Sequence, residues 1–226
     1  MGAADEEDQR AVDEYFEELV ARRRAKPCDD LVSNLAQIPE TQGGDKLDIG
    51  ALLNEQLGAG QNTSVHLIGN MISLLLSYPD QLARVREHPE LIPSTVEESL
   101  RYVSPLQARP RVSTRPLELH GVQIPEGARG LGWIQAANLD PEVFPDPERF
   151  DIGRSPNRHI AFGHGEHFCL GAWLARMAAR VVLEEWLASI QDCGHAGDGC
   201  LEIVPDFILR GPARLLVDVT PTSSLA

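Results

Sequence analysis

A ten-residue stretch, Phe162–Gly171, gathers groups that could hold a metal ion. Its sequence, FGHGEHFCLG, places three glycines and one cysteine directly before an expected helix. Glycine allows the backbone to bend tightly and to approach another group closely. At a helix N-terminus the dipole and the free N–H groups favour a thiolate, which is the form of sulfur that binds metals. A cysteine in an ordinary buried turn is the alternative, but the glycine spacing favours Cys169 as a ligand.

A carboxylate and a guanidinium, Glu98 and Arg101, lie three residues apart and share one face of an expected helix. Most pairs of this kind are solvated and contribute well under about 1 kcal/mol. A second group of polar residues, Ala59–Ser64, interrupts the long apolar helix expected over residues 53–75. It contains Asn62 and Thr63, and a threonine in mid-helix often only bonds back to the preceding turn. Neither feature identifies a site by itself.

Hydrophobic periodicity and turn residues predict the elements that must position these groups. Helices are expected over residues 5–25, 53–75, about 95–102 and 170–187, with a short helix after Asp29-Asp30. Alternating apolar residues around His120-Gly121 predict a hairpin, and the segment 140–165 is expected to be irregular. The predicted fold class is mainly α with a small β component. No repeat or long linker divides the chain, so one domain is expected over residues 1–226.

Composition and charge exclude several classes of protein. With 20 Lys and Arg against 34 Asp and Glu, the net charge of −14 argues against nucleic acid or an anionic membrane as the main partner. The acidic start does not resemble a signal peptide, and the apolar run Met71–Leu76 is too short to span a bilayer. We expect a cytoplasmic protein with reduced cysteines. Cys193, His195 and Cys200 fit no standard zinc spacing, so an ordinary loop is expected there.

The stretch FGHGEHFCLG resembles the haem-binding signature of the cytochrome P450 family at every defined position. The resemblance implies haem b as cofactor, with Cys169 as the axial thiolate on the iron and Gly171 beside it. It also implies that Phe162 packs near the sulfur and that His167 reaches a haem propionate. A thiolate ligand pushes electron density onto the iron and favours cleavage of dioxygen.

Further segments resemble elements of the same family. The pair Glu98 and Arg101 is similar to its Glu-x-x-Arg helix, and Pro147–Phe150 is similar to its Pro-x-Arg-Phe element. The resemblance implies that these two residues and Arg149 form a buried structural network beneath the haem. It also implies that Arg111 pairs with a haem propionate, because a planar guanidinium suits a carboxylate. An exposed basic edge is the alternative for Arg111.

The polar group Ala59–Ser64 resembles the helix that relays protons to dioxygen through a threonine and an acid. Asn62 stands at the position of the acid and cannot titrate, so proton delivery would depend on Thr63 and water. Arg176 and Arg180 are expected on a solvated helix face, with a role in docking an acidic electron donor as the alternative.

The resemblance covers the whole chain but only the C-terminal half of the family domain, from the helix lettered G to the helix lettered L. It implies a monooxygenase that inserts one oxygen atom from dioxygen into a small organic substrate, with electrons from a ferredoxin-type donor. The alternative is a truncated or split-gene relic that is catalytically silent alone and acts, if at all, by binding haem or a partner.

Overall fold

The computed structural model describes residues 3–38, 41–42, 45–46, 48–197 and 201–222. The chain forms two compact units, Met1–Asn62 and Thr63–Ala226, and the boundary falls inside the long helix α3, Ile49–Ser77. The described residues are mainly helical, with small two-stranded sheets, as the sequence predicts.

The first unit contains helices α1, Ala3–Ala25, and α2, Leu31–Ala36, a short antiparallel pair of strands, β1, Thr41–Gln42, and β2, Asp45–Lys46, and the start of α3. The predicted cap is present at α2, where the side chain of Asp30 accepts a hydrogen bond of 2.7 Å from the backbone N–H of Ser33. The core of this unit consists of apolar residues from all three helices: Phe16, Val20, Ala36, Ile49 and Leu53.

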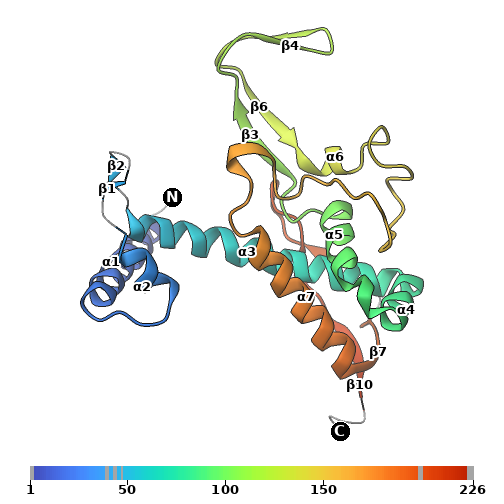
Figure 1. The fold of residues 1–226 in the computed structure, drawn as a ribbon. Helices are drawn as coiled ribbons and strands as arrows, with labels where there is room; N and C mark the ends of the chain where they lie inside the picture. Colours follow the sequence, from blue (N-terminus) through green and yellow to red (C-terminus); the bar gives the residue numbers. More distant parts are fainter. Residues whose placement is uncertain (1–2, 39–40, 43–44, 47, 198–200, 223–226) are drawn as a thin grey trace. The chain divides into compact units, whose positions relative to one another are not determined.

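The second unit is built around the C-terminal part of α3 (Figure 1). Its other helices are α4, Pro79–Glu87, η1, Pro89–Leu91, α5, Ile92–Tyr102, α6, Ile134–Asn138, η2, Gly165–His167, and α7, Ala172–Ser189. The core is contributed by α3, α4, α5 and α7 and by Phe150 and Ile152 of the irregular segment, and its fully buried members include Met71, Val85 and Leu183. Within the described part of the chain, no helix is long and apolar enough to cross a lipid bilayer.

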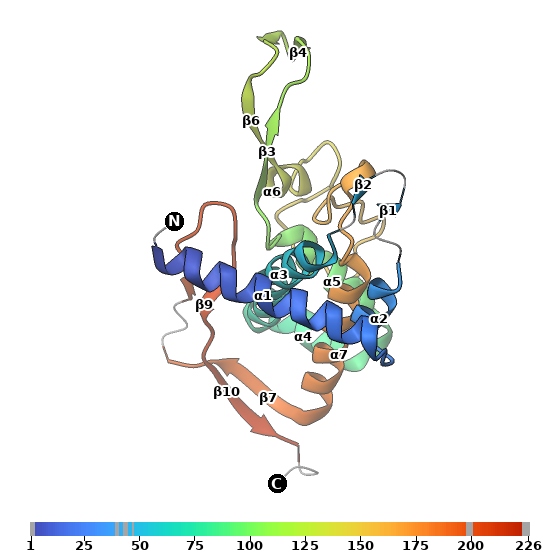
Figure 2. The same ribbon diagram turned by 90° about the vertical axis from the view of Figure 1, so that its left-hand side faces the viewer.

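The strands of the second unit pair in antiparallel fashion (Figures 1 and 2). The pairs are β3, Ala108–Val112, with β6, Arg129–Trp133; β4, Leu117–Leu119, with β5, Val122–Ile124; β7, Ile190–His195, with β10, Val217–Pro221; and β8, Glu202–Ile203, with β9, Pro212–Arg214. The predicted hairpin is β4–β5. Its turn has φ of 50° at His120 and 78° at Gly121, as a tight hairpin turn with two left-handed residues requires.

Several predicted helix starts and one predicted loop differ from the structure. Helices α3 and α5 begin at Ile49 and Ile92, earlier than predicted, and α7 begins at Ala172, two residues later. The first turn of α3 continues the apolar spacing, because Ile49 lies one turn before Leu53 and both are buried in the core of the first unit. Cys193 and His195 lie in strand β7 and not in a loop, since β10 pairs with this segment from farther along the chain. Cys200 lies outside the described residues, and in the part that is described no three metal-ligating side chains come together.

Candidate functional site

The loop around Cys169 ends at the first residue of α7. Gly163 and Gly165 have φ of 75° and 81°; they flank His164, and Gly165 is the first residue of η2. The backbone N–H of Cys169 donates to the carbonyl of Phe162 at 2.9 Å, and the carbonyl of Cys169 accepts from the N–H of Ala172 at 3.3 Å. These bonds tie Cys169 to the start of the loop on one side and to α7 on the other. The predicted irregular segment and the predicted helix after it are both present.

The thiol of Cys169 is exposed and forms no disulfide. A Cβ at Gly171 would lie 3.9 Å from the Sγ atom of Cys169, so the glycine keeps the space beside the sulfur open. Large apolar side chains flank the cysteine on the surface, with Phe168 48% and Leu170 75% exposed. His167 is also exposed, in η2. The loop therefore presents a sulfur ligand in an open, mainly apolar surrounding.

Glu98 and Arg101 form a buried ion pair, as the resemblance implies. Both side chains have no exposed surface, and Nε and Nη2 of Arg101 each donate to the Glu98 carboxylate at 2.8 Å. The guanidinium also donates to the backbone carbonyls of Asn138, Pro147 and Arg149, at 2.9, 2.8 and 3.2 Å. The pair thus fixes the irregular segment that precedes the cysteine loop.

The prediction that the side chain of Arg149 joins this buried network is wrong. Arg149 gives the network its backbone carbonyl, while its own guanidinium is 66% exposed and lies 3.9 Å from Asp151. Its place is taken by Arg154, whose side chain is 10% exposed and whose Nε donates to Glu98 at 3.2 Å. The reason is the chain path: with its carbonyl turned to Arg101, residue 149 points its side chain outward. No sequence pattern linked Arg154 to Glu98, because the two residues lie 56 positions apart in the chain.

The remaining predicted residues lie on two elements, β3 and α3. Arg111 is exposed on β3, and its Nη1 donates to the carbonyl of Pro110 at 2.8 Å. Asn62 is an exposed residue of α3 that ends the first unit, and Thr63 is a half-buried residue that begins the second. Their roles toward a cofactor remain predictions.

A second charged cluster, which the sequence did not indicate, joins α5 and α7. Glu97 accepts from Nε and Nη2 of Arg176 at 2.7 and 2.9 Å, and its carboxylate lies 3.0 Å from Nε2 of His159. Burial raises the pKa of Glu97, but the hydrogen bonds from His159 and Arg176 outweigh it and hold the pKa at about 2. The hydrogen bond from Arg176 to Glu97 raises the pKa of the guanidinium. The pair is therefore ionised at neutral pH.

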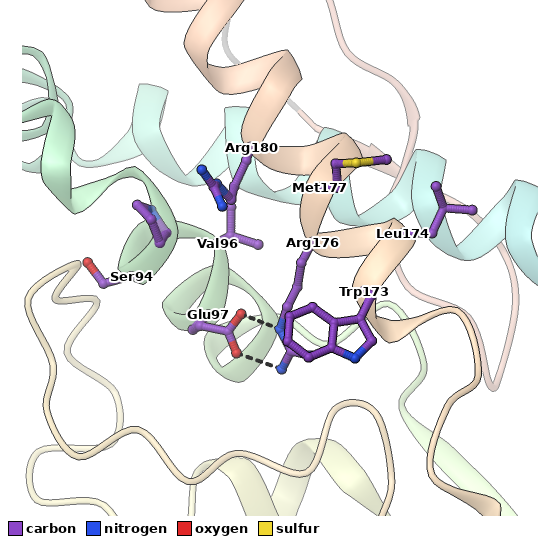
Figure 3. A pocket seen from close by; sticks show the side chains of 9 residues that line it. Ser94, Val96, Glu97, Trp173, Leu174, Arg176, Met177 and Arg180 are labelled. Atoms are coloured by element: carbon purple, nitrogen blue, oxygen red, sulfur yellow. Dashed lines mark hydrogen bonds and ion pairs between the residues drawn. The ribbon is translucent and has the colours of Figure 1, made fainter.

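The Glu97–Arg176 pair forms one wall of a hollow between α5 and α7 with a volume of about 650 Å³ (Figure 3). Its other lining side chains are mainly apolar and include Val96, Trp173 and Met177. Because α7 carries both this wall and the end of the cysteine loop, the two features share one rigid element.

Comparison with known proteins relates this geometry to one family. The family model for cytochrome P450 matches residues 6–190. The putative cytochrome P450 140 of Mycobacterium bovis is 43% identical over 222 residues, which are 96% of this chain and 50% of that protein. The 6-deoxyerythronolide B hydroxylase of Saccharopolyspora erythraea is 43% identical over 77% of this chain and 44% of its own length.

Solved structures of cytochromes P450 resemble the fold of this chain as well. The structure of cytochrome P450 CYP109Q5 from Chondromyces apiculatus is similar with a TM-score of 0.88 and 38% identity, over 96% of this chain and 56% of that one. The chain therefore spans about half the length of the curated relatives it matches. Members of this family are monooxygenases that use haem b. By sequence and by fold, the chain belongs to the cytochrome P450 family.

Proposed function

We propose that this chain supplies the haem-thiolate half of a monooxygenase, in which Cys169 would hold the haem iron through its sulfur. The observation that carries the proposal is the exposed, free thiol of Cys169, held by a glycine-rich loop at the start of α7. The sequence of that loop has the family's signature at every defined position.

The residues of this loop fit a haem. A thiolate is a ligand that haem iron accepts, and Gly171 leaves room beside the sulfur. The exposed apolar side chains of Phe168 and Leu170 offer surface that a flat macrocycle would cover. Two exposed cationic or protonatable side chains, His167 and Arg111, are the proposed partners of the haem carboxylates. When bound, a thiolate-ligated haem supplies the reductive activation of dioxygen.

The other proposed roles belong to this chain's own residues. Glu98, Arg101 and Arg154 hold the segment before the cysteine loop in place. Thr63 can pass a proton through its hydroxyl, whereas the amide of Asn62 can only orient water or substrate. We propose a small organic substrate, because two relatives are named as hydroxylases, of 6-deoxyerythronolide B and of vitamin D(3). We also propose a ferredoxin-type electron donor and a cytoplasmic location for the protein.

A second candidate function is a haem-binding or partner-binding protein without turnover of its own. The observation that favours it is the exposure of the cysteine loop, where the side chains of Phe168 and Leu170 are 48% and 75% exposed. A haem bound only by this exposed surface would leave water in contact with the iron, and controlled oxygen activation requires that water be excluded.

Carbon monoxide difference spectroscopy separates these possibilities. The full chain is mixed with haem, reduced and exposed to carbon monoxide, alone and together with the N-terminal half of a relative. We expect a thiolate-type Soret band that Cys169→Ser abolishes and that the control variants Cys28→Ser and Cys193→Ser retain. A band together with oxidation of an added hydroxylase substrate supports the monooxygenase, and a band without substrate oxidation supports the second candidate. A Cys169→Ser protein that keeps the full band would overturn the assignment of Cys169 as the ligand.

A further inference from the structure

Glu97 uses both of its carboxylate oxygens to hold two side chains from different parts of the second unit. One oxygen accepts from Nε of Arg176 at 2.7 Å, and the other accepts from Nη2 of Arg176 at 2.9 Å and lies 3.0 Å from Nε2 of His159. Figure 3 shows the carboxylate on α5 facing the guanidinium of α7 through both bonds. A two-point contact of this kind fixes orientation as well as distance.

His159 is fixed on both sides of its ring. Its side chain is 2% exposed, and its Nδ1 accepts from the backbone N–H of Ala161 at 3.2 Å. Because an accepting Nδ1 carries no proton, the hydrogen bonds assign the proton of the neutral ring to Nε2, which donates it to Glu97. The ring therefore connects Glu97 to the backbone that enters the cysteine loop.

Arg176 reaches the same loop through an aromatic ring. The carbon at the centre of its guanidinium lies 4.4 Å from the centroid of the Phe162 ring. The backbone carbonyl of Phe162 accepts a hydrogen bond from the N–H of Cys169. A guanidinium over an aromatic face is attractive, and more so when partly desolvated. Glu97 thus acts on the loop twice, through Arg176 to Phe162 and through His159 to Ala161.

We propose that Glu97 and Arg176 are positioning residues that hold Phe162 and thereby set the place of the Cys169 sulfur. This proposal rests on the proposed haem-thiolate function, because the position of the Cys169 sulfur matters for chemistry only if the sulfur binds the haem iron. The two adjacent carboxylates of α5 then hold different segments. Glu98, with Arg101, holds the segment around residues 147–157. Glu97 holds residues 159–169 and α7.

The first test measures amide hydrogen exchange of the full chain without haem, so it does not depend on cofactor binding. The variants are Glu97→Gln and Arg176→Gln. The control is Glu184→Gln, because Glu184 forms an exposed pair with Arg180 on the same helix, at 3.7 Å. We expect exchange at the Cys169 amide to accelerate about 10- to 100-fold in both variants, as loss of charge-assisted hydrogen bonds implies, and to be unchanged in the control.

Amides of the α3 core serve as the reference for global stability. Acceleration confined to the loop supports the proposal, whereas acceleration of less than about 2-fold, or equal acceleration at loop and core, overturns it. A second readout uses haem-loaded protein: both variants should bind haem but show a smaller fraction of the thiolate-type band than Glu184→Gln. If the unaltered chain shows no such band, alone or together with the N-terminal half of a relative, the haem proposal fails, while the exchange result still decides the role of the Glu97–Arg176 pair.

Discussion

Replacing Glu98 with glutamine removes the one carboxylate that, among the described residues, forms an ion pair with the fully buried guanidinium of Arg101. The carboxylate accepts two bonds of 2.8 Å from Arg101, one of 3.2 Å from Arg154, one of 3.1 Å from Asn157 and one of 3.0 Å from the N–H of Asp151. At an effective dielectric constant of about 20, unit charges about 4 Å apart interact by about 4 kcal/mol. Breaking a buried pair from one side costs about 3–5 kcal/mol in measured cases. We expect Glu98→Gln to lower the free energy of unfolding by that amount.

Urea unfolding followed by tryptophan fluorescence measures the change, because Trp186 packs against the core of the second unit. With a slope of about 2 kcal/mol per molar urea, the midpoint should fall by about 1.5–2.5 M. Glu142→Gln is the control, since Glu142 is exposed and near the same segment. The double variant Glu98→Leu with Arg101→Met should cost less than the two single variants together, because it removes both fully buried charges and leaves only Arg154, which is 10% exposed, without its carboxylate. A Glu98→Gln protein within about 1 kcal/mol of the unaltered protein would refute the reasoning.

Three further predictions concern packing and pH. Leu183→Ala should cost about 2–5 kcal/mol in chemical unfolding, because Leu183 is fully buried, whereas Leu174→Ala on the exposed side of the same helix should change it by less than about 0.5 kcal/mol. Gly211→Ala should lower the melting temperature, since a Cβ there would overlap the ring of His66, and an unchanged melting temperature would contradict this packing. The pKa of Glu97 is held at about 2 against a usual 4.5, so its contribution to stability is complete above pH 4.5 and is lost toward pH 2. The difference in unfolding free energy between Glu97→Gln and the unaltered protein should therefore shrink over that range, and a difference that grows there would show the opposite shift.

Local signals in the sequence were sufficient for much of the fold. The turn at His120-Gly121 and the cap at Asp30 are present as predicted, because each depends on residues close in sequence. The spacing of Glu98 and Arg101 by itself favours an exposed pair, and only the family resemblance implied its burial, which depends on distant segments such as the one around Pro147. Strand β7 was missed because its partner, β10, comes later in the chain and pairing partners leave no local trace.

The errors at the site have the same origin. Arg149 and Arg154 are both near Glu98 in space, and only the path of the turn between them decides which guanidinium reaches it. Glu97 was overlooked beside Glu98 because its partners, His159 and Arg176, lie on segments far along the chain. Sequence patterns identify the residues of a motif, whereas the contacts that hold the motif in place require the folded chain.

The identity of the iron ligand is the point on which the proposed function depends. X-ray absorption at the iron edge of haem-loaded protein, alone or complemented with the N-terminal half of a relative, detects a sulfur bound to iron directly. We predict one iron–sulfur contribution in the unaltered protein and in Cys193→Ser, and none in Cys169→Ser. An iron–sulfur contribution that persists in Cys169→Ser, or haem-loaded protein without any such contribution, would contradict the assignment of Cys169.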